Sequence, residues 1–234
     1  MDLYDRQSLY DAISVGTPVE GEHLRGLDLS GLDLGGANLR GSDLNNANLT
    51  DTNLEESHLD RVTLEGATLK NTNLTGAHLS EVTLTDVDLS SCTLGRITAV
   101  NSTFTHVSIL GGDLRKANLS GASLIYCTLK DLDLTGSRLE NMKMLFCLIE
   151  CCTLSECGLT GSNFGLSRFR KTLLNKANLT LTSFTGSTLE DVQILNSVLE
   201  RVDLTLIKAQ NLDITGSSQR NITLDRAKIV GLTR

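Results

Sequence analysis

The residues of this chain best suited to chemistry are its four histidines and six cysteines, the side chains that most often bind zinc. His58 and His78 are separated by twenty residues, and so are Cys127 and Cys147. A pair of ligands is too few for a zinc site, which needs three or four. Whether these pairs meet depends on elements that place residues twenty apart side by side.

Those elements follow from a five-residue repeat. A bulky apolar residue recurs at every fifth position from Leu24 to Ile229, which gives 42 central positions without a slip in register. Leu, Ile, Phe or Met fills 39 of them, and the exceptions are Ala99, Ala209 and Gln219. A second restricted position lies two residues before each centre and, after Glu22, is never charged. Two positions in five therefore face inward and three face outward.

Neither common backbone period explains this repeat. A helix would rotate successive centres by about 140° and scatter them around its axis, and a flat strand would alternate every two residues. The backbone is therefore expected to turn once in each five-residue unit.

Units such as GANLR, LTGAH and KANLS resemble the A(D/N)LXX consensus of the pentapeptide-repeat family, and the resemblance covers residues 22–231. It implies an all-β fold, a right-handed quadrilateral β-helix in which each unit forms one side and four units form a coil. Residues twenty apart then stack on adjacent coils. The repeat predicts about ten and a half coils in a rod about 50 Å long.

The expected organisation is an N-terminal cap over residues 1–21, the β-helix over residues 22–231 and a tail over residues 232–234. The cap includes a short amphipathic helix within Asp2–Val15, whose apolar residues are Leu3, Leu9, Ala12 and Ile13. Pro18, the single proline, precedes the coils. Within a coil, a proline would lack the backbone N–H that donates a hydrogen bond to the neighbouring coil. No comparable C-terminal cap is visible in the sequence.

This register leaves no loop for an active site, so we expect no enzyme activity, no catalytic residue, no cofactor and no metal. The histidines are interpreted as surface residues. Cys92, Cys127, Cys147, Cys152 and Cys157 occupy inward positions, where a free thiol packs as a small apolar group. Cys151 is the outward exception. Without a secretory signal peptide or a long apolar run, we expect a cytoplasmic protein with reduced thiols and no membrane insertion.

An outward apolar column is the candidate partner-binding site. It comprises five residues on three successive coils, namely Ile125, Tyr126, Leu145, Phe146 and Leu166. Thr105 and His106 precede the column, and Thr185 and Gly186 follow it. Aromatic residues in a polar rim are typical of protein interfaces. The alternative is that these are ordinary scattered apolar residues, such as Leu181, Val198 and Leu206 elsewhere in the second half.

Two functions from different classes stay open. The first is a non-catalytic protein-protein interaction scaffold, with a bacterial effector or adaptor role, or export by a specialised secretion system, open by family analogy. The alternative is a DNA-mimicking gyrase inhibitor or protector, as in the quinolone-resistance branch of the family. Its basis is an acidic surface formed by Asp28, Asp33, Asp43, Asp51, Glu55, Glu56, Asp60 and Glu65.

Charge is unevenly distributed between the two parts of the chain. Residues 1–90 carry 16 acidic and 5 basic side chains, whereas residues 91–234 carry 12 acidic and 16 basic ones. The basic part opposes DNA mimicry, and the scarcity of surface aromatics among its Lys and Arg residues opposes direct nucleic-acid binding. A homodimer is expected to form through either the C-terminal coil or the apolar column.

Overall fold

A left-handed backbone conformation at every fifth residue bends the chain into coils. The computed structural model describes residues 4–234. In it, left-handed residues occur at every fifth position from Gly16 to Gly231, except at Ser91. Their φ angles lie between 49° and 77°. This region disfavours side chains with a Cβ, and Gly, Asn and Asp tolerate it best, so these three types are common there. The predicted turn in each unit is confirmed.

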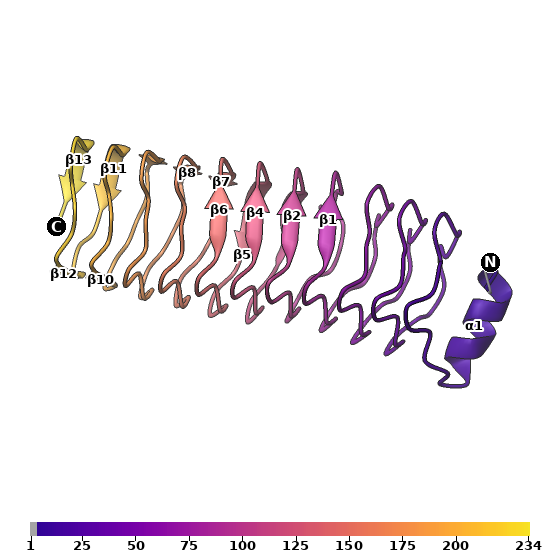
Figure 1. The fold of residues 1–234 in the computed structure, drawn as a ribbon. Helices are drawn as coiled ribbons and strands as arrows, with labels where there is room; N and C mark the ends of the chain where they lie inside the picture. The colour runs from indigo at the N-terminus through magenta and orange to yellow at the C-terminus, as the bar shows by residue number, and fades with distance from the viewer. Residues whose placement is uncertain (1–3) are drawn as a thin grey trace.

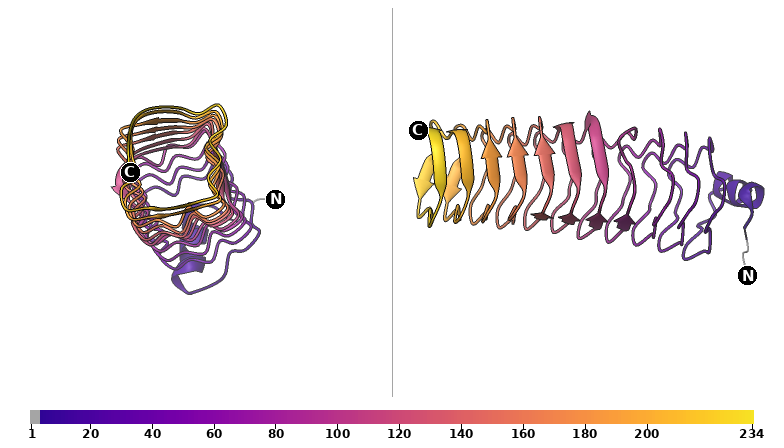
Figure 2. Two further views of the ribbon diagram at one scale, coloured as in Figure 1. Left: turned by 90° about the vertical axis from the view of Figure 1, so that its left-hand side faces the viewer. Right: turned by 90° about the horizontal axis from the view of Figure 1, so that it is seen from above.

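Four such corners complete one turn, and the end-on view in Figure 2 shows the resulting four-sided outline. Residues twenty apart pair in parallel along the length of the rod, from His23 with Asp43 to Asp213 with Thr233. The stacked turns form a rod, with the two ends of the chain at opposite ends (Figure 1). The fold is therefore a parallel β-solenoid, as the sequence predicted.

Regular strands occupy only part of this ladder. The first sheet has the order β1-β2-β4-β6, with bounds Thr83–Thr85, Thr103–Thr105, Ser123–Ile125 and Lys143–Leu145. The second has the order β13-β11-β9-β8-β7-β5-β3, with bounds Lys228–Thr233, Lys208–Asp213, Thr188–Glu190, Arg168–Arg170, Leu148–Glu150, Thr128–Asp133 and Ser108–Asp113. The third pairs β10 with β12, at Val198–Glu200 and Ser218–Arg220.

The strand-bearing part spans about eight turns, fewer than the ten and a half coils expected. Earlier coils keep the same register through isolated bridges such as Asp28 with Asn48. Tight turns close these sides at each corner, as where the Ala37 amide donates to the Leu34 carbonyl at 3.0 Å. Where tight turns close both ends of a side, only one residue of that side pairs with the neighbouring coil.

A short helix covers the first coil. The helix α1 (Arg6–Ser14) begins with a capping box in which Asp5 and Ser8 bond to each other's backbone amides. Leu9 is fully buried, and the Arg6 guanidinium donates to the carbonyls of Asp28 and Ser30. The expected capping helix is thus present, while Asp2 and Leu3 lie outside the described residues.

The interior is a continuous column of apolar side chains that also contains buried serines and threonines. Inward Ser and Thr side chains are buried, and their hydroxyls donate to backbone carbonyls of the preceding coil. Ser137, for example, donates to the Leu114 carbonyl at 2.8 Å and accepts from the Ala117 amide at 3.2 Å. Within residues 4–234, no buried side-chain nitrogen or oxygen lacks a hydrogen-bond partner. These hydroxyls therefore link neighbouring coils from the inside.

Replacing Ser137 by alanine is expected to lower the free energy of unfolding by about 1 kcal/mol, because two inter-coil hydrogen bonds are lost. Chemical denaturation followed by circular dichroism measures the change. Ser155→Ala, at an outward position, is the matched control and should stay within about 0.5 kcal/mol of the parent protein. Equal effects at the two positions would contradict the proposed stabilising role of the inward hydroxyl.

Candidate functional site

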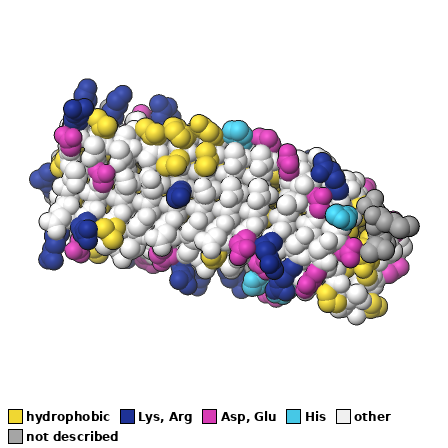
Figure 3. Space-filling model, in the orientation of Figure 1, with side chains coloured by type: hydrophobic (Ala, Val, Ile, Leu, Met, Phe, Trp, Pro, Cys, Tyr) yellow, Lys and Arg dark blue, Asp and Glu magenta, His cyan; other side chains and the backbone are white. Residues whose placement is uncertain are grey.

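The apolar strip, defined as Ile125, Tyr126, Leu145, Phe146 and Leu166, lies on one corner of the rod. The strands β4 and β6 end at Ile125 and Leu145, and the following residues turn the corner toward the seven-stranded sheet. Tyr126, Phe146 and Leu166 are 54%, 46% and 57% exposed, and the other two are half-buried. Figure 3 shows hydrophobic side chains gathered in two adjacent rows on this part of the surface.

Side chains of the strip stack along the rod. The Tyr126 and Phe146 rings lie 5.0 Å apart at an interplanar angle of 20°, and His106 lies 5.5 Å from Tyr126. His106 in turn faces Asp86, with 3.2 Å between Nδ1 and Oδ1. The aromatic rings of the strip therefore continue a stack of side chains that begins outside it, at the Asp86 carboxylate.

Leu166 ends the stack by leaning over Gly186. A Cβ atom on Gly186 would lie 2.9 Å from Leu166 Cδ2, so the glycine leaves the space that the leucine occupies. Gly165 likewise lies beneath Leu145, because a Cβ atom on Gly165 would lie 3.7 Å from Leu145 Cδ2. Small residues thus form the downstream limit of the strip.

The exposed members occupy corner positions that the local backbone does not favour for them. Tyr126, Phe146 and Leu166 have φ angles of 56°, 58° and 59°. A bulky residue in this region costs about 1 kcal/mol or more relative to glycine. Because about half of each side chain is also exposed, the coil gains less from these residues than from a buried centre. Their presence is better explained by a contact outside the chain than by folding.

Leu206 belongs to the same corner column, although its spacing from the strip was not recognised in the sequence. It is 47% exposed, has a φ of 60° and lies two coils beyond Leu166. The forty-residue separation, twice the length of one turn, was the signal that could have identified it. Leu148, at the start of β7, is half-buried beside the strip and extends it onto the next sheet.

The histidine pair stacks as the register predicted, with the His58 and His78 rings 4.8 Å apart. Arg40 Nη2 lies 2.8 Å from His58 Nδ1. Partial burial, together with the charges of Arg40 and His78, lowers the pKa of His58 below its usual value. Among residues 4–234, no three His, Cys, Asp or Glu side chains gather as a metal-binding group.

All six cysteines are free thiols, and their directions follow the prediction. Cys151 is exposed, whereas the other five are buried at inward positions. Burial raises the pKa of Cys152 to about 11 and that of Cys92 and Cys157 to about 12. These three thiols stay protonated at neutral pH, which makes them poor nucleophiles and explains them as core residues.

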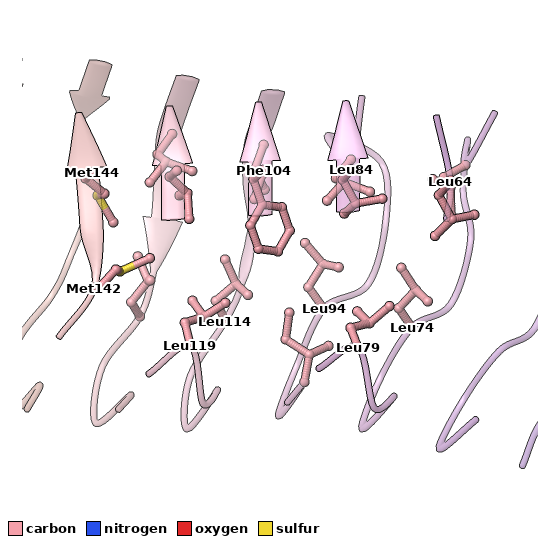
Figure 4. A pocket seen from close by; sticks show the side chains of 17 residues that line it. Leu64, Leu74, Leu79, Leu84, Leu94, Phe104, Leu114, Leu119, Met142 and Met144 are labelled. Atoms are coloured by element: carbon pink, nitrogen blue, oxygen red, sulfur yellow. The ribbon is translucent and has the colours of Figure 1, made fainter. Parts of the chain in front are cut away.

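Two cavities within residues 4–234 differ in the side chains that line them. A void of about 30 Å³ lies inside the coils, lined by Leu, Ile, Phe and Met side chains including Leu64, Phe104 and Met144 (Figure 4). It is comparable to the volume of one water molecule and carries no polar group. A surface hollow of about 540 Å³ lies beside Gly95 and Gly112. Its charged groups include Arg115, which is paired to Asp113.

The predicted acidic surface is distributed around the rod. Asp43, Asp28, Asp33 and Asp60 lie on four different sides, since successive five-residue units form successive sides. The first three accept hydrogen bonds from the backbone amide two residues later, and Asp60 pairs with Arg40 at 3.1 Å. Asp51 accepts from the Asn71 side chain. Glu55, Glu56 and Glu65 are exposed. Several of these carboxylates therefore contribute to the coil itself.

The fold and the repeat define the class of protein, which is a parallel β-solenoid built from five-residue units. The sequence profile described as "Pentapeptide repeats (8 copies)" matches residues 23–61, 57–96, 104–141 and 152–191. These segments cover more than half of the chain, which therefore belongs to the pentapeptide-repeat family. No curated protein matches the chain in sequence. None of the helices within residues 4–234 has the length and apolar character needed to cross a membrane.

Several solved structures are similar to this chain. HetL, a pentapeptide repeat protein involved in heterocyst differentiation regulation from the cyanobacterium Nostoc sp. strain PCC 7120, is 21% identical, with a TM-score of 0.51 over 96% of each chain. Full-length QnrB1, a plasmid-mediated fluoroquinolone resistance protein, is 15% identical, with a TM-score of 0.30 over 91% of each chain. A pentapeptide repeat protein from the Arabidopsis thaliana thylakoid lumen is 27% identical, with a TM-score of 0.27 over 49% of this chain and 66% of its own.

A substitution of Leu166 by asparagine is expected to leave the free energy of unfolding unchanged or to raise it by up to about 1 kcal/mol, because asparagine tolerates the left-handed corner better. The same change at Leu154, a fully buried centre, should lower it by more than about 3 kcal/mol. Urea titration of both variants measures the contrast. A loss at Leu166 greater than about 1 kcal/mol would mean that this leucine stabilises the fold.

Proposed function

We propose that this protein is a non-catalytic scaffold that binds another protein molecule through the apolar strip. The observation that carries the proposal is the run of three exposed bulky side chains, Tyr126, Phe146 and Leu166, at left-handed corners on successive coils. Each is disfavoured locally and about half exposed. A partner that covered the strip would remove this apolar surface from water, at about 25 cal/mol per Å².

The composition and surroundings of the strip suit a protein partner. Its centre holds two stacked aromatic rings, which are enriched at the energetic centres of protein interfaces. Its surroundings are polar, with His106 and Asp86 before it and Thr185 after it, while Lys143 and Arg168 are exposed on either side. Charged and polar groups around an apolar centre exclude solvent and orient the partner. The rod supplies a rigid support because residues one coil apart pair along its length.

A DNA-mimicking role toward gyrase is the second candidate, and the acidic N-terminal segment is the observation that favours it. Residues 1–90 carry 16 acidic and 5 basic side chains. The carboxylates lie on several sides and many bond within the coils, whereas residues 91–234 carry more basic than acidic groups. A basic DNA-binding surface would be repelled by that second part. The scaffold function therefore remains the preferred proposal.

The binding function is tested by photo-crosslinking from the strip in cells of the native host. A benzoylphenylalanine placed at Tyr126 or Phe146 should yield discrete protein adducts, because both side chains are exposed at the proposed contact. Combining Phe146 labelling with Tyr126→Ser and Leu166→Ser should abolish these adducts. Mass spectrometry then identifies what was captured.

Position 181 is the matched control for the crosslinking experiment. Leu181 is also an exposed leucine at a left-handed corner, with 47% exposure and a φ of 61°, but it lies on a different corner. A label there should give none of the strip-specific adducts. Identical adducts from positions 146 and 181, or none from position 146, would contradict binding through the strip.

The same proposal predicts that the purified protein leaves gyrase unaffected. Supercoiling by DNA gyrase, with and without a fluoroquinolone, should be unchanged when the protein is added in excess, because its surface is not uniformly anionic. Protection of gyrase from the drug would instead support the second candidate. Asp51→Lys with Glu56→Lys should then weaken that protection, since both carboxylates are exposed at corners.

A further inference from the structure

The apolar strip is part of a longer corner column with opposite charges at its two ends. We name this column the ridge; from the N-terminal side it contains Asp86, His106, Tyr126, Phe146, Leu166, Gly186, Leu206 and Arg226. All eight have left-handed φ angles, so they occupy equivalent positions on successive coils. At about 4.8 Å per coil, the ridge extends for roughly 34 Å. Its order is acidic, aromatic, aliphatic, small, aliphatic and basic.

Neighbouring residues reinforce the charges at both ends. Asp88 is exposed beside Asp86, and Lys228 is exposed beside Arg226. Of the ion pairs formed within residues 4–234, none includes Arg226 or Lys228. Asp86 faces His106, and its side chain remains 70% exposed. One end of the ridge therefore presents two carboxylates, and the other presents two cations together with the exposed carboxylate of Asp225.

We propose that the partner of the strip is a second copy of this chain, bound ridge to ridge in antiparallel orientation. This inference rests on the proposed binding function and specifies its occupant. The twofold axis crosses the ridge between Phe146 and Leu166, at right angles to the rod. Because every ridge position is one coil from the next, placing Phe146 opposite Leu166 of the second copy determines all the other pairs.

In this register the apolar side chains of the two ridges face one another. Phe146 meets Leu166 of the second copy, Tyr126 meets the corner at Gly186, which the same Leu166 side chain covers, and His106 meets Leu206. The aromatic rings of one copy thus face the Leu166 side chain of the other around the axis. A twofold contact requires this kind of self-complementary surface.

The register is also complementary in charge. Asp86 faces Arg226 of the second copy, and Asp88 faces Lys228, so the twofold axis generates four opposite-charge pairs. A parallel alignment would place carboxylates against carboxylates and cations against cations. Charge therefore selects the antiparallel orientation. Because the contact is long but narrow, its area falls at the small end for specific complexes, and we expect a weak, salt-sensitive dimer.

The test is charge reversal at the two ends of the ridge, followed by sedimentation velocity over a concentration series at low ionic strength. Asp86→Lys alone places like charges together twice and should raise the dimer dissociation constant at least about tenfold. Arg226→Glu alone should do the same. Both substitutions suit the backbone, because lysine occupies the left-handed corner at Lys116 and glutamate does so at Glu56.

Mixing the two variants supplies the decisive measurement. In a mixed dimer the introduced lysine faces the introduced glutamate, and the native Arg226 faces the native Asp86. Association should therefore return to within about threefold of the parent protein, because every facing pair again has opposite charges. Glu56→Lys and Arg96→Glu, on the diagonally opposite corner, are the matched controls and should leave self-association unchanged.

A monomeric parent protein, or single variants that associate as well as the parent, would overturn the antiparallel dimer. So would a mixture of the two variants that is no stronger than either alone. These outcomes leave the binding function separately testable, because crosslinking at Tyr126 and Phe146 also captures a different protein. Adducts of twice the chain mass support self-association, whereas adducts with an unrelated protein alone support the scaffold function and contradict the dimer.

Discussion

The structure depends on one backbone constraint, the left-handed conformation that recurs at every fifth residue. It turns the chain through a corner after each unit and places residues twenty apart in register. Inward Leu and small side chains then fill the space between the four sides, and inward hydroxyls connect neighbouring coils. The period of five in the sequence is therefore a consequence of where the backbone must bend. Strand pairing follows from these corners.

The same constraint gives meaning to residues on the surface. Glycine, asparagine and aspartate satisfy a corner at little cost, whereas Tyr126, Phe146 and Leu166 are disfavoured there. The corner conformation alone does not favour such residues, although other side chains such as Lys116 also occupy it. The apolar strip is thus identified both by exposure, which is common for single hydrophobic residues, and by local conformational cost. The second criterion separates it from an exposed leucine on a flat side.

Most of the fold could be predicted from the sequence, because an unbroken repeat of Leu24, Leu29, Leu34 and their successors assigns a direction to every side chain. The stacking of His58 on His78 and the exposure of Cys151 followed from the same register. The extent of regular strands did not, because it depends on whether each corner closes with a tight turn. Strand β3, which continues through the corner at Gly111 and Gly112, shows this dependence.

The candidate site was predicted in composition but not in conformation. Apolar side chains at 125, 126, 145, 146 and 166 were evident from their spacing, while the positive φ of Tyr126 and the lean of Leu166 over Gly186 required coordinates. Leu206 was separated from the group in sequence by the intervening Gly186. Side-chain lean along the rod depends on backbone geometry, which a residue pattern does not encode.

The uniform pairing of residues twenty apart has a consequence for folding kinetics. Inter-coil contacts join segments about 20 residues apart in a chain of 234, which corresponds to a relative contact order of about 0.09. That value is typical of helical bundles and lies well below those of β-sandwiches, whose strands pair across long separations. Each new coil closes a loop of the same short length onto the coil before it. This all-β protein therefore has the topology of a fast folder. Its coils can form one after another, each on the coil before it, without pairing strands that are distant in the sequence.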